Sequence, residues 1–270
     1  MTSPQHQEAP IAAFFDLDKT IIATSSAFAF GRTLVSHGML STKDALALVL
    51  AETGYMISGH SQAQMDDTKD QLTQMVAGLK IEDLQHTIDH TLLHRVVPTI
   101  FAEARELIDT HHARGHDVII ISASVKELVD PIARELGADR TITTQLEVVD
   151  GTYTGELELY CRGETKAAEI TDLARSLGYD LSQCYGYSDS ATDIPMLEAV
   201  GHPYAVNPDR ALKKHALRSN WPVLNFKNPV PLLSSPSKKD LGIGGAVAAA
   251  LALGVGSWWL STHWGELRSS

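Results

Sequence analysis

Short apolar runs bounded by polar residues recur along the chain, and their lengths and spacing predict strands. We expect strands at 11–16, 116–124, 140–145, 184–190 and 202–207, and a hairpin over 146–159 that turns at Asp150-Gly151. Between them, apolar residues at helical intervals predict helices at 125–137, 163–178, 193–201 and 209–219, with Gly137 and Gly178 as stops and a capping start for the second.

Strands and helices alternate through this part of the chain, and this order is typical of an α/β fold. We predict a Rossmann-like, largely parallel sheet with right-handed crossovers and helices on both faces. In such sheets, ligands bind at the carboxyl ends of the strands. Polar residues at strand ends are therefore the first candidates for a functional site.

A different pattern occupies the interval 26–113, where "DALALVLAE", "QLTQMVAGL" and "IEDLQHTIDHTLLHRV" space their apolar residues at helical intervals. No strong strand pattern interrupts it. We expect an all-helical insert at 26–113 within a catalytic core made of 11–25 and 114–226. His86, His90 and His94 share one face of an expected helix; we interpret them as a solvated polar face, the alternative being a metal or pH-sensitive site.

The C-terminal part changes character again. Prolines and serines at 227–240 predict a linker, and 241–260 is an uncharged stretch of the length that spans a bilayer. Flanking lysines and tryptophans favour a single transmembrane helix that anchors a cytoplasmic body to the membrane. The alternative is a buried or loosely associated helix. A stripe of small residues on it suggests a homodimer: Gly242, Ala246, Ala250 and Gly254.

Composition narrows the classes of function. The formal net charge of -11 argues against a nucleic-acid-binding protein, which needs clustered Lys and Arg to neutralise phosphates. The two cysteines, Cys161 and Cys184, match no metal-binding spacing, and no secretory signal precedes them. We interpret both as structural residues of a protein in a reducing compartment.

Four polar groups lie at predicted strand ends or helix starts, in an order that suggests one site. "DLDKT" follows the first strand with Asp16 and Asp18, and "VIIIS" ends in Ser122. Lys166 opens a predicted helix, and "SDSATD" follows a strand with Asp189 and Asp193. Each group is common by itself, but together they predict an active site.

In these motifs the chain resembles the haloacid dehalogenase superfamily of phosphatases, in the subfamily that includes phosphoserine phosphatase. The resemblance covers roughly residues 11–224. The family pattern D-x-D-x-T matches Asp16, Asp18 and Thr20, and the helical insert matches the position of the family's cap. Ser122, Lys166 and the pair Asp189 and Asp193 match the later motifs, with Ser188 where a Gly is usual.

The resemblance implies a Mg²⁺-dependent phosphoric monoester hydrolase that works through an aspartyl-phosphate. Asp16 would be the nucleophile and a metal ligand, and Asp18 the general acid and base, with its backbone carbonyl reaching the metal. Asp189 would be the third ligand of Mg²⁺, which prefers oxygen. Ser122 and Lys166 would bind the phosphoryl group, supported by Thr20 and Asp193.

The substrate remains open at this level. Phosphoserine phosphatases carry a Glu shortly after the first motif, and Ser25 stands there in this chain. The expected substrate is a small phosphorylated metabolite, with histidinol phosphate and a lysolipid phosphate as alternatives. A phosphotransferase of the same fold and a non-catalytic membrane-tethered binding protein are the rival functions. The insert offers side chains that could bind the leaving group: Arg32, His37, Tyr55, His60 and Arg95.

Overall fold

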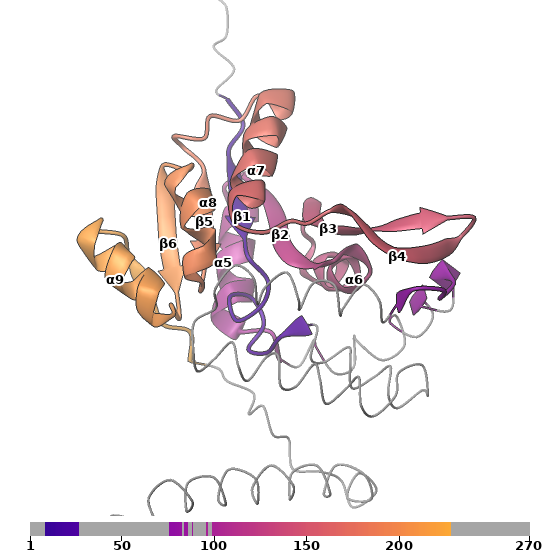
Figure 1. Cartoon of the computed structure of the whole chain (residues 1–270). Helices are drawn as coiled ribbons and strands as arrows, with labels where there is room; N and C mark the ends of the chain where they lie inside the picture. Colours follow the sequence, from indigo (N-terminus) through magenta and orange to yellow (C-terminus); the bar gives the residue numbers. More distant parts are fainter. Residues whose placement is uncertain are drawn as a thin grey trace, which may run out of the picture. The chain divides into compact units, whose positions relative to one another are not determined.

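A computed structural model describes residues 9–26, 76–82, 84–85, 88, 96 and 99–227, all of which belong to one unit, Met1–Pro229. These residues form a seven-stranded sheet of order β4-β3-β2-β1-β5-β6-β7 (Figure 1). Its strands are β1 (Ala12–Phe15), β2 (Asp117–Val125), β3 (Arg140–Val149), β4 (Thr152–Leu159), β5 (Tyr185–Ser188), β6 (His202–Val206) and β7 (Val223–Leu224).

All neighbouring strands pair in parallel except β3 and β4, which are antiparallel. The chain builds the sheet outward from β1 through β2 to β3, and then returns to place β5 on the other side of β1. The strand order therefore reverses at β1, and the crevice at the carboxyl end of β1 is where a sheet of this kind binds ligands.

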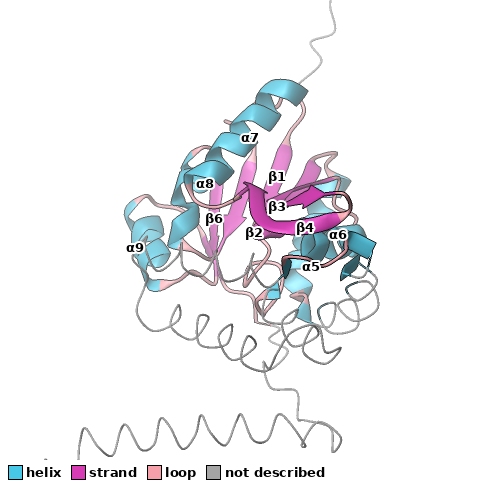
Figure 2. Cartoon of the chain, turned by 45° about the vertical axis from the view of Figure 1, so that its right-hand side comes forward, coloured by secondary structure: helices cyan, strands magenta, loops and turns pink. Residues whose placement is uncertain are grey.

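Helices cover both faces of the sheet, as the sequence predicts (Figure 2). They are α5 (Ala102–Ala113), α6 (Lys126–Leu136), α7 (Glu164–Leu177), α8 (Ile194–Glu198) and α9 (Arg210–Arg218), with a 3₁₀ turn, η2, at Ala191–Asp193. One apolar cluster joins Phe15 and Ile120 to α5 and α6. The other joins Phe14 and Ile119 to α7, α8 and α9.

The central strands are apolar on both sides for this reason. The four residues of β1 are all buried, and Val118 to Ile121 of β2 are fully buried. A strand that is covered on both faces needs no alternation of polar residues, so a continuous apolar run marks it in the sequence.

Most expected elements are present, with two differences. The predicted strand at 140–145 and the first arm of the hairpin form one continuous strand, β3, with register shifts near Gln145 and Leu146. The hairpin of β3 and β4 projects from the rest of the sheet (Figure 1). The expected capping start of α7 is wrong, because Gly163 is its N-cap and makes no side-chain cap bond.

The interval 26–113 is described only in part. Residues 27–75 lie outside the described residues, and so do His86, His90 and His94, which the sequence places on one helix face. Its last helix, α5, packs on the sheet through Ala104 and Ile108. The predicted linker and anchor lie outside the described residues from 228 onward. Among the helices that the structure does describe, none has the length and apolar content to cross a bilayer.

Candidate active site

The predicted site residues gather where the strand order reverses. Asp16 directly follows β1, and its backbone N–H donates to the carbonyl oxygen of Tyr187 on β5 over 2.9 Å. Asp189 directly follows β5, and Ser122 lies within β2, the other neighbour of β1. Parallel pairing brings these three strand ends to one edge of the sheet.

Lys166 links two of the carboxylates. Its Nζ donates to Oδ1 of Asp16 over 2.6 Å and to Oδ2 of Asp193 over 2.8 Å. The Lys166 side chain is only 2% exposed, so the ammonium is compensated by these partners and not by water. The two carboxylates raise the pKa of Lys166 and outweigh the opposing effect of burial, so this group stays charged.

The start of α7 places Lys166 at the site. Gly163, the N-cap, has a φ of 55°, a left-handed value that favours glycine. A Cβ at this position would meet the carbonyl oxygen of Thr192 at 3.7 Å, so α7 begins close to the η2 turn. Asp193 belongs to that turn and also accepts from Ser188 Oγ over 2.7 Å.

Asp18 has a separate set of partners. Its Oδ1 accepts the backbone N–H of Ser26 over 2.8 Å, and its Oδ2 lies 3.1 Å from Ser26 Oγ and 2.9 Å from Ser124 Oγ. Burial raises the pKa of Asp18, and the hydrogen bonds from Ser26 and Ser124 oppose the rise. The two aspartates of "DLDKT" thus lie in different environments, one against an ammonium and the other against neutral donors.

Thr20 and Ser122 complete the immediate surroundings. Thr20 Oγ1 donates to Oδ2 of Asp16 over 3.3 Å, which leaves both Asp16 oxygens with a partner. Ser122 is 1% exposed, and its Oγ accepts the backbone N–H of Ser124 over 3.1 Å. Within the described residues, Ser122 makes no direct hydrogen bond to the aspartates or to Lys166.

A cation-binding role fits Asp189. The residue is 9% exposed, and its carboxylate interacts with the charges of Asp16 and Asp193. Burial and then the charge of Asp16 raise the pKa of Asp189, and Lys19 partly opposes them. A buried carboxylate beside another one is costly unless a cation compensates it.

Mg²⁺ matches this set of donors, because it uses few carboxylates and completes its shell with phosphate and water. In the described part of the chain, no three acidic, histidine or cysteine side chains form a metal-binding group by themselves. A metal here would therefore depend on the carboxylates of Asp16 and Asp189 together with a backbone carbonyl, water and substrate.

Two residues at the site, Ser26 and Ser124, were not predicted from the sequence, and Ser188 was named only as the residue that replaces the usual Gly of the last motif. Ser188 and Ser124 stand within two residues of predicted site residues, at Asp189 and Ser122. Their proximity to strand ends was the available signal. Ser26 gave no such signal, because its contact with Ser124 joins residues 98 positions apart.

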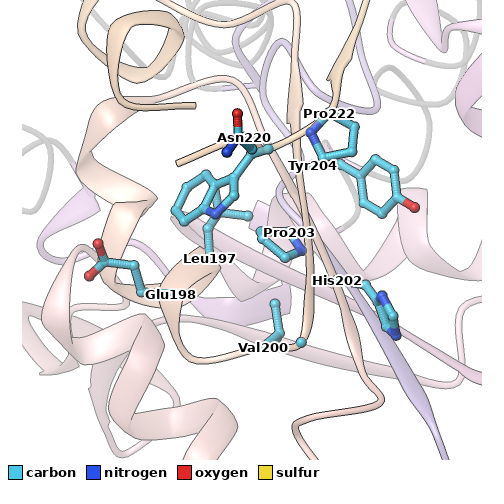
Figure 3. A pocket seen from close by; sticks show the side chains of 10 residues that line it. Leu197, Glu198, Val200, His202, Pro203, Tyr204, Asn220 and Pro222 are labelled. Atoms are coloured by element: carbon cyan, nitrogen blue, oxygen red, sulfur yellow. The ribbon is translucent and has the colours of Figure 1, made fainter. Parts of the chain in front are cut away.

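A pocket of about 430 Å³ lies elsewhere, between α8, β6 and the turn after α9 (Figure 3). It is lined by Leu197, Glu198, Val200, Gly201, His202, Pro203, Tyr204, Asn220, Trp221 and Pro222. None of the residues at the carboxyl ends of β1, β2 and β5 contributes to it. The chemistry of the carboxylate cluster is therefore not located in this pocket.

Comparisons with known proteins bear on the family of the chain and on its fold. A model of the haloacid dehalogenase-like hydrolase family matches residues 13–198. A protein named "Probable phosphatase" from Mycobacterium tuberculosis is 47% identical over 247 residues, covering 90% of this chain and 86% of the relative. The phosphoserine phosphatase SerB1 of the same organism is 32% identical, covering 89% of this chain and 80% of its own length.

A histidinol-phosphatase of Neisseria meningitidis serogroup C is also 32% identical, over 80% of this chain and 98% of the relative. Among solved structures, a protein of unknown function from Bordetella pertussis Tohama I is 26% identical with a TM-score of 0.71, covering 80% of this chain and 98% of that one. A phosphoserine phosphatase in apo form, 19% identical, has a TM-score of 0.59 over 83% of this chain and 97% of its own, which shows a shared fold.

Proposed function

The chain belongs to the haloacid dehalogenase-like hydrolase family and is an enzyme of the phosphoric monoester hydrolase class, and from this premise we propose its mechanism and its kind of substrate. We propose that it hydrolyses a small phosphorylated metabolite, with Mg²⁺ and through an aspartyl-phosphate on Asp16. The observation that carries this proposal is the Lys166 ammonium, which bridges Asp16 and Asp193 inside a buried carboxylate cluster.

Asp16 is the proposed nucleophile. One of its oxygens attacks phosphorus, a new P–O bond forms, and the bond between phosphorus and the leaving oxygen breaks. Asp18 gives its proton to that leaving oxygen, so the alcohol departs neutral. Water then gives a proton to Asp18 and attacks phosphorus, which releases phosphate and restores Asp16.

Lys166 and Ser122 are the proposed binding residues for the phosphoryl oxygens. An ammonium fixed by two carboxylates needs no reorganisation when charge develops in the transition state. Mg²⁺, held by Asp16, the Asp18 carbonyl and Asp189, would reduce the repulsion between the phosphate dianion and the carboxylate nucleophile. Asp193 and Thr20 keep Lys166 and Asp16 in place.

The leaving group is proposed to be an alcohol of amino-acid type. Two relatives carry names with such substrates, a phosphoserine phosphatase and a histidinol-phosphatase, each 32% identical to this chain. A panel of phosphoserine, histidinol phosphate and a lysophosphatidate distinguishes these from a lipid substrate. Addition of competing alcohols separates hydrolysis from phosphotransfer, because a phosphotransferase would yield new phosphomonoesters in place of phosphate.

The decisive test is Asp16→Asn, with Asp172→Asn as a matched control at an exposed position of α7. The wild-type protein should release phosphate from p-nitrophenyl phosphate with Mg²⁺ and not with EDTA. Asp16→Asn should lose turnover by a factor of about 10⁴ or more and form no hydroxylamine-sensitive phosphoenzyme. Asp172→Asn should retain both. Turnover that survives in Asp16→Asn would refute the nucleophile assignment.

A further inference from the structure

Asp18 is held by hydroxyl groups from two distant parts of the chain. Ser26 and Ser124 lie 98 residues apart, yet their Oγ atoms are 2.6 Å from each other. Both also lie within hydrogen-bond distance of the same oxygen, Oδ2 of Asp18, at 3.1 and 2.9 Å. The backbone N–H of Ser26 donates a hydrogen bond to the other oxygen, Oδ1, over 2.8 Å.

These contacts form one unit. Three short oxygen–oxygen contacts join Ser26, Ser124 and Asp18, but the two serines supply only two hydroxyl hydrogens. Each hydroxyl therefore orients the other as well as the carboxylate. Removal of either hydroxyl leaves the second one with a different set of partners, so their effects on Asp18 should not add.

The backbone at both serines is itself fixed. Ser26 is fully buried and follows a segment that pairs with residues 99–101 through Ala23 N–H to Thr99 O and Phe101 N–H to Ile21 O, both 2.9 Å. Ser124 lies where the register of β2 against β3 shifts, and Thr144 Oγ1 binds the preceding carbonyl, that of Ala123, over 2.7 Å. The hydroxyls thus reach Asp18 from backbone segments that are held by further hydrogen bonds.

We propose that Ser26 and Ser124 are positioning residues that set the orientation of the Asp18 carboxylate toward the leaving group. This rests on the proposed role of Asp18 as the acid that protonates the departing oxygen. A general acid must lie within hydrogen-bond reach of its acceptor, and its contribution is greatest for a leaving group that departs poorly without a proton.

The test compares two leaving groups in single turnovers, before hydrolysis of the phosphoenzyme. One substrate is p-nitrophenyl phosphate, whose phenolate departs readily. The other is an alkyl phosphate, namely whichever of phosphoserine, histidinol phosphate and the lysophosphatidate the wild-type protein cleaves fastest. Ser26→Ala and Ser124→Ala should slow release of the alkyl alcohol about 10- to 100-fold and release of p-nitrophenolate less than about 3-fold. The double variant should lose less than the product of the two.

Three controls make the outcome specific. Ser124→Thr keeps a hydroxyl and should restore the alkyl rate. Ser176→Ala removes the hydroxyl of an exposed serine on α7 and should leave the ratio of the two rates unchanged. In an Asp18→Asn background, Ser124→Ala should have no further effect on either rate.

The positioning role would be overturned if the variants slowed the release of both leaving groups equally. It would also be overturned if Ser124→Ala caused the same loss of rate in the wild-type and the Asp18→Asn backgrounds. Failure of the wild-type protein to cleave any of these substrates would instead overturn the proposed function. Thermal unfolding of each variant identifies any variant that fails to fold. If Ser124→Ala fails to fold, the rates of Ser26→Ala and Ser124→Thr are compared instead.

Discussion

Lys166 explains how several acidic residues share one buried site. Its ammonium contacts Asp16 and Asp193, while Asp189 lies close enough to Asp16 for their charges to interact. Among the described residues, three buried carboxylates therefore share the ammonium of Lys166 and the charge of Lys19. The remaining negative charge favours a further cation and, with it, the metal-dependent chemistry proposed for the family motif.

Lys19, between the two aspartates of "DLDKT", also has a definable role. Its φ is 62°, an uncommon left-handed value for a residue with a side chain, and its charge lowers the pKa of Asp189 against the effect of burial. The turn after Asp16 is therefore tight, and it brings a second positive charge toward the carboxylate cluster.

His111 is a buried histidine outside the catalytic cluster. It is 1% exposed, and its ring nitrogens lie 2.9 Å from His116 Nδ1 and 2.9 Å from the hydroxyl of Tyr187. Burial, followed by the charges of His116, Arg114 and His112, lowers the pKa of His111 from 6.5 to about 4. The unfolded chain therefore takes up this proton at a higher pH than the folded protein does.

We predict from this that His111 lowers the free energy of unfolding by about 3 kcal/mol as the pH falls from about 6.5 toward 4. The raised pKa values of Asp16, Asp18 and Asp189 act in the opposite direction, so the measured quantity is the difference between two proteins. In denaturant unfolding, the stability of the wild-type protein relative to His111→Gln should fall as the pH is lowered through this range. Parallel curves for the two proteins would contradict the assignment of this loss to His111.

Among the elements, the β3–β4 hairpin shows most directly how local sequence specifies structure. Asp150 and Gly151 have φ values of 50° and 74°, as a type I′ turn requires, and this turn matches the twist of the two strands. The hairpin also binds the insert, because Tyr153 exchanges backbone hydrogen bonds with Gly78 and Leu79. A substitution in the turn is therefore expected to weaken these hydrogen bonds as well.

Gly151→Ala should destabilise the protein by about 1 kcal/mol, because a Cβ strains the left-handed backbone. The cost is conformational, since no atom of the described residues beyond the chain neighbours lies within 4 Å of where that Cβ would stand. Gly151→Asn should cost less, because asparagine tolerates this conformation. Equal midpoints of thermal unfolding for the alanine variant and the wild-type protein would be inconsistent with the turn described here.

At the scale of the molecule, the arrangement of the sheet concentrates the site in the centre. β1 comes first in the chain but lies in the middle of the sheet, between β2 and β5. Each predicted site residue lies between Asp16 and Asp193, and β7 closes the sheet at Leu224. The unit Met1–Pro229 therefore includes the complete set of proposed catalytic groups.

A chain that ends at residue 227 should consequently keep its turnover of p-nitrophenyl phosphate within about twofold of the full chain. The reason is that all proposed catalytic groups lie in the unit Met1–Pro229, and the stability of a packed unit depends mainly on its own contacts. The same pair of proteins tests the anchor that the sequence predicts at 241–260. If the anchor is present, the full chain sediments with membranes, whereas the shortened chain stays in the supernatant. Loss of activity on truncation would show that the tail contributes to the site.

The sequence by itself determined the order of the elements and the positions of the acidic residues along them. Continuous apolar runs mark strands that are buried on both faces, and parallel strands must end at a common edge, so Asp16, Ser122 and Asp189 could be expected together. The family motifs assigned candidate roles to the same residues. These inferences depend on local periodicity and on general rules of sheet connection.

Only the tertiary structure decided which of these groups touch. The bond from Lys166 to Asp16 joins residues 150 positions apart, and the serine pair at Asp18 joins residues 98 apart. Such contacts depend on strand register, on the left-handed Gly163 that starts α7 and on the shift in β2, and none of these leaves a periodic pattern in the sequence. The physical reason is that side-chain contacts at this range form between elements, whereas periodicity records only the burial of each element.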